Sequence, residues 1–102
     1  MLNKKPIRSK KLRDSARGQQ CTVNIAGVCS YNDEQTILAH YNFEGGTTGG
    51  KSSDTSAGFC CYECHHELDN NKLSSDDALF YKARSMVRTM KIWIYDGLVV
   101  VK

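Results

Sequence analysis

The sequence lacks a long hydrophobic run, because no stretch approaches the roughly 20 apolar residues that a membrane-spanning helix needs. It also lacks an apolar segment behind its basic first eleven residues, so we expect no signal peptide, no membrane partner and a cytoplasmic location. The five cysteines are an odd number that does not fit a closed disulfide framework, and in a reducing compartment cysteines are more often metal ligands or catalytic groups. A chain of 102 residues fits one domain with a small core, which a bound metal would help to stabilise.

The charge is distributed unevenly along the chain. Residues 1–18 hold seven basic groups against one acidic group, a net charge of +6, whereas the remaining 84 residues carry a net charge of −3. This pattern predicts a basic N-terminal arm, residues 1–17, that reaches DNA, and one domain, residues 18–102; the alternative is a solvated tail. The arm residues expected to contact nucleic acid are Lys4, Lys5, Arg8, Lys10, Lys11, Arg13 and Arg17.

Two β elements are expected in the first half of the chain. Residues 21–29 have a cysteine at each end and an Ala-Gly turn between, which predicts a hairpin. Residues 36–41 predict a strand on which Leu38 and His40 share one face. The Gly-, Ser- and Thr-rich residues 44–58 show no periodicity and indicate a long loop.

Two helices are expected in the second half. Residues 59–70 indicate a turn followed by a helix, and a second helix is expected to start near Ser74 or Ser75 and to be capped at Asp96-Gly97. The sequence therefore predicts a small α+β domain with an extra C-terminal helix. The apolar residues of that helix that are expected to face the core are Leu79, Ala83, Met86, Met90 and Trp93.

The strongest local signal is the pair Cys61 and Cys64 at a helix start, since two thiolates separated by two residues can bind one tetrahedral zinc. A structural zinc site needs two more ligands, which Cys21 and Cys29 can supply. A hairpin pair together with a helix-start pair is the arrangement of a treble clef. The alternative is a set of buried free thiols, and Cys60, which does not fit the spacing, is interpreted as a core thiol.

Two histidines are candidates for chemistry. His40 is expected on a strand that runs back against the helix beginning at Cys61, and His65 directly follows the last cysteine. Asp69 lies one helical turn beyond His65, so it can accept a hydrogen bond from that ring and set its tautomer. A lone strand histidine is often simply packed, so His40 is either structural or part of an active site.

Taken together, these residues resemble a family of short phage and prophage proteins, the YbcO-like nucleases, and are similar also to the catalytic domain of the phage RecA-dependent nuclease Ref. The resemblance covers most of the chain from about residue 12 onward and implies a bacterial host cell. The residues that carry it are Cys21, Cys29, Leu38-Ala39-His40, Lys51, Asp54, Cys61, Cys64, His65, Glu67 and Asp69, supported by Ala16-Arg17-Gly18 and Ile92-Trp93.

The resemblance implies a zinc-stabilised treble-clef or ββα-metal (HNH-like) domain, in which the four cysteines hold a structural zinc. His40 matches the general base, and His65 matches the helix histidine that holds a catalytic Mg or Mn ion. Asp54 falls near the middle residue of the HNH pattern, which either orients the base or assists the metal. Ala39 stands where many HNH proteins carry a metal-binding aspartate, so Asp54 or His66 is expected as the second ligand.

The resulting expectation is a metal-dependent DNA endonuclease of low sequence specificity, related to phage or prophage recombination. His40 would take the proton from the attacking water, and a divalent ion would neutralise charge on the phosphate. The arm and Lys51 would hold flanking phosphates. Two alternatives stay open: a zinc-stabilised DNA-binding module without catalysis, and an adaptor that docks on a RecA-type recombination protein through its acidic body.

Overall fold

The computed structural model of the chain describes residues 5–43, 52–70 and 72–102. Two residues predicted to contact DNA, Lys4 and Lys51, lie outside the described residues. The fold is a small α+β arrangement that ends with the expected additional helix. Its elements are, in chain order, α1 (Lys10–Asp14), the short 3-10 helix η1 (Asp33–Gln35), β1 (Ile37–His40), β2 (Ala57–Cys60), α2 (Tyr62–Asp69) and α3 (Ser75–Tyr95).

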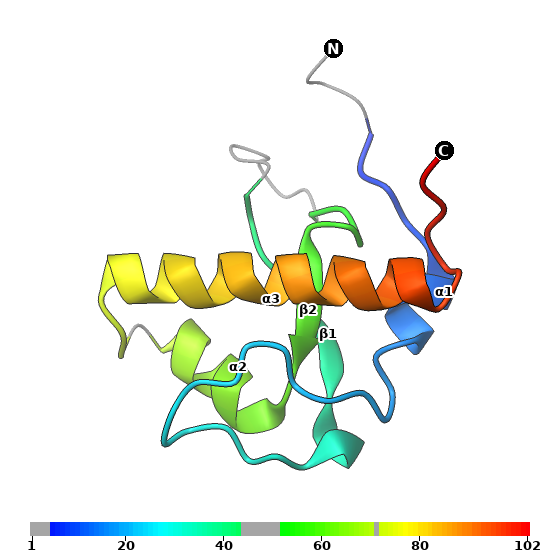
Figure 1. Cartoon of the computed structure of the whole chain (residues 1–102). Helices are drawn as coiled ribbons and strands as arrows, with labels where there is room; N and C mark the ends of the chain where they lie inside the picture. The colour runs from blue at the N-terminus through cyan, green and yellow to red at the C-terminus, as the bar shows by residue number, and fades with distance from the viewer. Residues whose placement is uncertain (1–4, 44–51, 71) are drawn as a thin grey trace.

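β1 and β2 form an antiparallel hairpin around which the helices are arranged. His40 pairs with Ala57, and Leu38 pairs with Phe59. Side chains of paired residues point to the same face of a sheet, so these four share one face and Ala39 points to the other. Figure 1 shows α3 lying across the hairpin, with α2 below it and α1 near the C-terminal end of α3.

The two faces of the hairpin are covered by different elements. The face that carries His40 packs against α1 and the end of α3, and the opposite face packs against α2 and the segment that contains Val23. Because of this arrangement, His40 points to the side of the hairpin that α1 covers. The first cluster consists of Leu12, Ala16, Leu38, Ala57, Phe59 and Trp93. The second consists of Val23, Ile25, Ala39, Tyr41, Cys60, Cys61, Cys64 and Leu68.

The hairpin predicted over residues 21–29 is wrong. The structure has no strand there, and the chain instead forms a tight turn in which the amides of Val28 and Cys29 both donate to the carbonyl of Ile25, at 3.1 and 3.0 Å. Asn24 adopts a positive φ of 49°, a conformation that asparagine tolerates better than most residues. The alternation of apolar residues in this segment therefore did not predict its structure.

The long loop predicted over residues 44–58 is wrong at its C-terminal end, because Ala57 and Gly58 begin β2. These two residues have low intrinsic strand propensity, so the sequence gives little sign of a strand. Its pairing with β1 and its burial on both faces stabilise it instead. The strand predicted over residues 36–41 is confirmed as β1.

The start and end of α3 follow the predicted capping residues. Ser74 is the N-cap and accepts a hydrogen bond from the amide of Asp77 at 3.1 Å. Asp96 is the C-cap, and Gly97 follows it with a φ of 78°. The predicted inward face is only partly correct, because Trp93 is buried but Leu79 is 53% exposed.

The buried face of α3 is polar where the helix crosses β2. A Cβ at Gly58 would clash with the side chain of Ser85, so the helix lies very close to the strand. Thr89 Oγ1 accepts from the amide of Phe59 at 3.0 Å, and Thr22 Oγ1 lies 2.7 Å from Ser85 Oγ. The hydroxyl groups satisfy polar atoms at this crossing, which is why hydrophobic periodicity did not identify the face.

The segment predicted as a basic arm is partly folded onto the body. The structure shows a helix over Lys10–Asp14, with Ser9 as its N-cap. Leu12 and Ala16 are buried, at 5% and 1% exposure, against the hairpin and Trp93. None of the helices in the described residues is long and apolar enough to cross a membrane.

Candidate functional site

The four cysteines predicted to bind zinc come together where the turn at residues 21–29 meets the start of α2. Their sulfur atoms all lie within 4.8 Å of one another, and Cys29 Sγ is 3.8 Å from Cys61 Sγ. Four sulfurs at roughly 2.3 Å from a tetrahedral zinc lie about 3.8 Å from each other. The group formed by Cys21, Cys29, Cys61 and Cys64 can therefore hold a metal ion such as zinc.

Backbone amides point at two of these sulfurs. Cys61 is the N-cap of α2, and its Sγ accepts from the amide of Cys64 at 3.4 Å. The amide of Asn24 donates to Cys21 Sγ at 3.5 Å. Hydrogen bonds of this kind favour the thiolate over the thiol. The turn and the helix start are thus arranged for negatively charged sulfur.

The neighbouring thiols perturb one another's protonation. Burial, together with the nearby Cys21 and Cys61, raises the pKa of Cys29 to about 11. Hydrogen bonds from Cys60 and Cys64 lower the pKa of Cys21. A metal ion bound by these sulfurs displaces the remaining protons, so its affinity depends on pH. Cys60 is fully buried and stands outside the four-sulfur group, in agreement with a core thiol.

His40 and Asp54 form a second constellation. His40 Nε2 lies 2.7 Å from Asp54 Oδ1. The imidazole stands at the end of β1 with 31% of its side chain exposed, whereas the Asp54 side chain is completely buried. If Nε2 carries the proton that it donates to the carboxylate, Nδ1 is left as an acceptor. This pairing gives the histidine a fixed orientation and one basic nitrogen.

The carboxylate of Asp54 accepts hydrogen bonds from the N-terminal segment as well. Its Oδ2 accepts from the amide of Ser9 at 2.6 Å and from Arg13 Nη1 at 2.7 Å. Arg8 Nη1 lies 3.5 Å from Oδ1. A carboxylate offers about four lone-pair positions, and the hydrogen bonds with His40, the Ser9 amide and Arg13 occupy three of them, with the charge of Arg8 close by. These contacts leave Asp54 little capacity to bind a metal ion in addition.

The same donors determine the charge of Asp54. Burial alone raises the pKa of a carboxyl group, but hydrogen bonds from His40, the Ser9 amide and Arg13, together with the charge of Arg8, hold the pKa of Asp54 below its usual value. Asp54 is therefore ionised at neutral pH. Two guanidinium groups against one carboxylate leave an excess of one positive charge beside His40.

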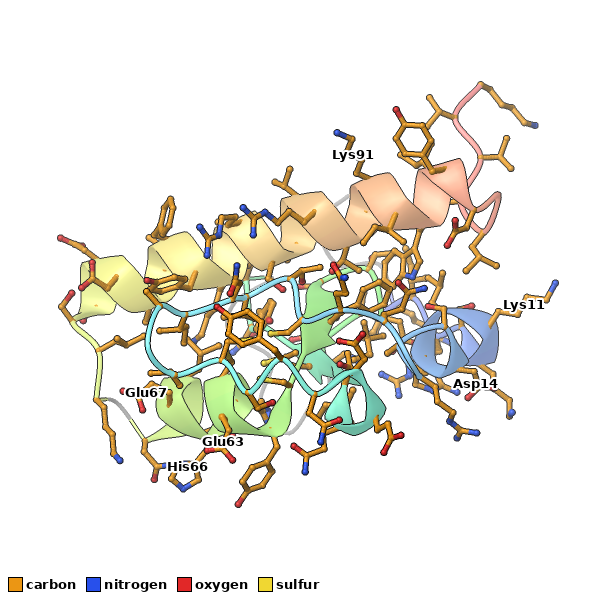
Figure 2. The ribbon with its side chains drawn as sticks, turned by 60° about the horizontal axis from the view of Figure 1, so that its bottom comes forward. Lys11, Asp14, Glu63, His66, Glu67 and Lys91 are labelled. Atoms are coloured by element: carbon orange, nitrogen blue, oxygen red, sulfur yellow. The ribbon has the colours of Figure 1, made fainter. Side chains whose placement is uncertain are left out.

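The structure does not bring His65 into this constellation. His65 Nε2 lies 3.4 Å from Asp69 Oδ2, which is the predicted helical pair, and α2 packs on the face of the hairpin opposite to the His40 face. His66 is exposed and stacks on Tyr62 with ring centroids 6.0 Å apart; Figure 2 shows it pointing away from the ribbon. Within the described ranges, the four cysteines are the one group of three or more potential ligands at such short separations. The ligands of a catalytic Mg or Mn ion stay a prediction.

The basic residues predicted to contact DNA divide into two groups. Arg8 and Arg13 contact Asp54, and Lys10 pairs with Asp14 at 2.8 Å. The second group is exposed on the N-terminal segment and consists of Lys5, Lys11 and Arg17. Figure 2 shows Lys11 extending from α1 away from the body of the protein. The second group is thus exposed to solvent and its contact with DNA stays a prediction, whereas Arg8 and Arg13 lie beside His40 through Asp54.

Sequence reasoning missed the backbone contacts that hold this site together. The amide of Asp54 donates to the carbonyl of Ile7 at 2.8 Å, and the amide of Ile7 donates to Ser53 Oγ at 2.8 Å. Ser9 donates its amide to Asp54 while its hydroxyl caps α1. The one available signal was Ser9, because serine just before a short apolar-periodic segment is typical of an N-cap.

Comparisons with known proteins agree with the resemblance found in the sequence. The profile of a family described as "Putative nuclease YbcO" matches residues 10–98. Two relatives, "Putative nuclease YbcO" of Escherichia coli strain K12 and "Putative nuclease ybcO" of Enterobacteria phage 82, are each 39% identical over 92 residues, which is 86% of this chain and 95% of theirs. A solved structure of a bacteriophage protein from Escherichia coli K-12 is 32% identical, with a TM-score of 0.71, and the match covers 85% of this chain and 100% of that one.

Proposed function

The chain belongs to the "Putative nuclease YbcO" family, and we propose that it is a zinc-stabilised DNA endonuclease of the HNH type, of low sequence specificity, that acts in phage or prophage recombination. The observation that supports catalysis most directly is the half-exposed His40 held by the buried, ionised Asp54. A histidine that only packs in a core does not need a fully buried, ionised carboxylate to orient it. The four-cysteine group supplies the stability that so small a core lacks.

His40 is the general base in this proposal. Its Nδ1 accepts the proton of the water that attacks phosphorus, while Nε2 stays bonded to Asp54 and the resulting imidazolium is stabilised by that carboxylate. Asp54 is a positioning residue. Of the two roles that the HNH pattern allows for it, orienting the base and assisting the metal, the contacts of its two oxygens support the first.

A divalent Mg or Mn ion, when bound, would polarise the phosphate and assist the leaving oxygen. His65 and Asp54 do not fit as a shared ligand pair for it, because Asp54 already has three hydrogen-bond partners and an ion pair with Arg8, and α2 packs on the other face of the hairpin. His65 and His66 on α2 stay its candidate ligands from the sequence. Dependence on an added ion is therefore a prediction of this proposal that experiment has to test separately from the role of His40.

The test uses the full, zinc-loaded chain and end-labelled DNA. Single-stranded and duplex oligonucleotides are incubated with the protein in EDTA, in Mg²⁺ or in Mn²⁺, each with and without a RecA-type recombination protein. We expect cleavage at many positions that requires an added ion and is absent in a His40→Ala preparation purified in parallel. DNA that is bound but stays intact under every condition would instead support the non-catalytic binding module, and cleavage only with the recombination protein would support a partner-dependent enzyme.

A further inference from the structure

Two guanidinium groups converge next to His40. Arg13 Nη1 lies 2.7 Å from Asp54 Oδ2, and Arg8 Nη1 lies 3.5 Å from Asp54 Oδ1. The arginine side chains are 37% and 42% exposed, whereas the Asp54 side chain is completely buried. Each arginine thus contacts the buried carboxylate and is itself partly exposed to solvent.

The geometry of these contacts leaves room for an anion. A guanidinium is planar and carries five N–H donors, and the contacts with Asp54 involve Nη1 of each arginine. Arg8 Nη1 also donates to the carbonyl of Ser52 at 3.3 Å. The partly exposed edges of two such groups match the oxygens of a phosphate, to which arginine donates in pairs.

The local charge favours an anion as well. Two arginines against the ionised Asp54 leave one excess positive charge beside His40, and the neighbouring charges on α1, Lys10 and Asp14, pair with each other at 2.8 Å. Phosphodiester hydrolysis needs positive charge at the phosphate, because negative charge increases there in the transition state. Arg8 and Arg13 place such charge within contact distance of the residue that orients the base.

The backbone holds both arginines to the turn that carries Asp54. Ile7 exchanges hydrogen bonds with this turn through its amide and its carbonyl, and the amide of Ser9 donates to Asp54 itself. Donors fixed in this way need little reorganisation during the reaction. Ile7 and Arg8 lie just before residues 10–98, the segment that matches the family profile.

We propose that Arg8 and Arg13 form an anion site that binds the phosphodiester group to be cut, each guanidinium contacting Asp54 on its buried side and the phosphate on its exposed side. The proposal rests on the proposed function, since it concerns the substrate of the same site. It assigns these two residues to the scissile phosphate, in contrast to Lys5, Lys11 and Arg17, which are placed to contact flanking phosphates.

The first experiment measures cleavage kinetics under the conditions that support cleavage. Arg13→Gln should lower kcat/KM by about 10²–10³-fold, as loss of one donor to transition-state charge typically does, and Arg13→Lys should restore part of it. Arg8→Gln should act in the same direction with a smaller loss of stability, because its contact with Asp54 is longer. The control is Lys91→Gln, which removes the same positive charge from an exposed position on α3. This variant should cleave like the natural protein. Folded, zinc-loaded Arg8 and Arg13 variants with natural kcat/KM would overturn the proposal.

The second experiment needs no cleavage. Dimethyl phosphate is titrated into the full, zinc-loaded, isotope-labelled chain, and the imidazole and guanidinium resonances are followed by NMR. We expect saturable shifts at His40, Arg8 and Arg13 that disappear in the Arg8→Gln, Arg13→Gln double variant and persist in Lys91→Gln. No shift, or equal weak shifts at every exposed lysine and arginine, would overturn the proposal. Phosphate binding at this site in a chain that never cleaves DNA would instead remove the proposed function and leave the anion site in place.

Discussion

Replacement of Asp54 by asparagine tests the arrangement around His40 with very little change of shape. In one orientation the new NH₂ group faces the Ser9 amide and Arg13, which are both donors. In the other it faces Arg8, a donor, and His40, which can accept from it only after a change of tautomer. Hydrogen bonds to a charged group contribute roughly 1.5–3 kcal/mol each. Pairs with partly exposed arginines contribute less, about 0–1 kcal/mol, because solvent screens them. Since the replacement weakens the buried contacts rather than removing all of them, we expect a loss of about 2–4 kcal/mol in the free energy of unfolding.

The assay is chemical denaturation of the natural protein and the Asp54→Asn variant in saturating zinc, at pH 8 and pH 6. The pKa of Asp54 is held below its usual value in the folded protein, mainly by His40 and the Ser9 amide acting against burial. Its stabilisation is therefore complete above the unfolded pKa of about 3.9 and is lost only as the pH falls through the lower folded pKa. The difference between the two proteins should not shrink from pH 8 to pH 6, because Asp54 stays ionised and also stabilises the imidazolium form of His40.

A matched control is Asp69→Asn, because Asp69 is an exposed carboxylate that also pairs with a histidine. This variant should change the free energy of unfolding by less than about 0.5 kcal/mol. An Asp54→Asn variant as stable as Asp69→Asn would refute the description of Asp54 as an ionised carboxylate held by buried hydrogen bonds. A difference in unfolding free energy that shrinks between pH 8 and pH 6 would mean that Asp54 titrates in this range. That result would contradict its lowered pKa.

Three further predictions concern the metal group, the helix crossing and the basic surface. Cys64→Ser should abolish tight zinc binding and unfold the domain, since such sites contribute roughly 10 kcal/mol or more; metal analysis and circular dichroism check this, and unchanged zinc content would contradict it. Gly58→Ala should cost about 1–3 kcal/mol in denaturation experiments, because its Cβ would meet the Ser85 side chain, and an unchanged midpoint would mean that α3 lies further from β2. Replacing Lys11 and Arg17 by glutamine should lower the slope of log K against log salt for duplex DNA by about 1.8, at about 0.9 per phosphate contact, and an unchanged slope would show that neither contacts DNA.

The parts of the fold that depend on local signals could be predicted from the sequence. Ser74 and Asp96 mark the two ends of α3, because capping residues satisfy backbone N–H and C=O groups that have no partner within the helix. The four zinc-ligand candidates could be identified from their spacing, since the reach of a tetrahedral metal restricts how far apart its ligands lie in a turn. The resemblance of the chain to a known family added the expectation that a chain with these two cysteine pairs also carries a catalytic histidine.

The parts that depend on contacts between distant residues could not be predicted. β2 contains Ala57 and Gly58, which become a strand only by pairing with β1. The contact between Arg13 and Asp54 joins residues 41 positions apart, so the charge pattern of residues 1–17 could indicate a DNA-binding arm but not a pair of arginines inside the site. The alternation of side chains along β1 could predict the face of the hairpin on which His40 lies. It could not predict that α2, which carries His65, packs on the opposite face.

The central claim is that His40 is the base of a nuclease site, and the most direct measurement is the single-turnover rate of DNA cleavage by the His40→Ala variant. We expect the single-turnover rate to fall by about 10²–10⁴-fold, while zinc content, thermal stability and DNA affinity stay unchanged. Tyr62→Ala, which removes an exposed aromatic ring from α2, separates loss of the base from a general effect of removing a ring side chain. A His40→Ala variant that cleaves DNA at the natural rate, or one whose only defect is a lower melting temperature, would contradict the claim.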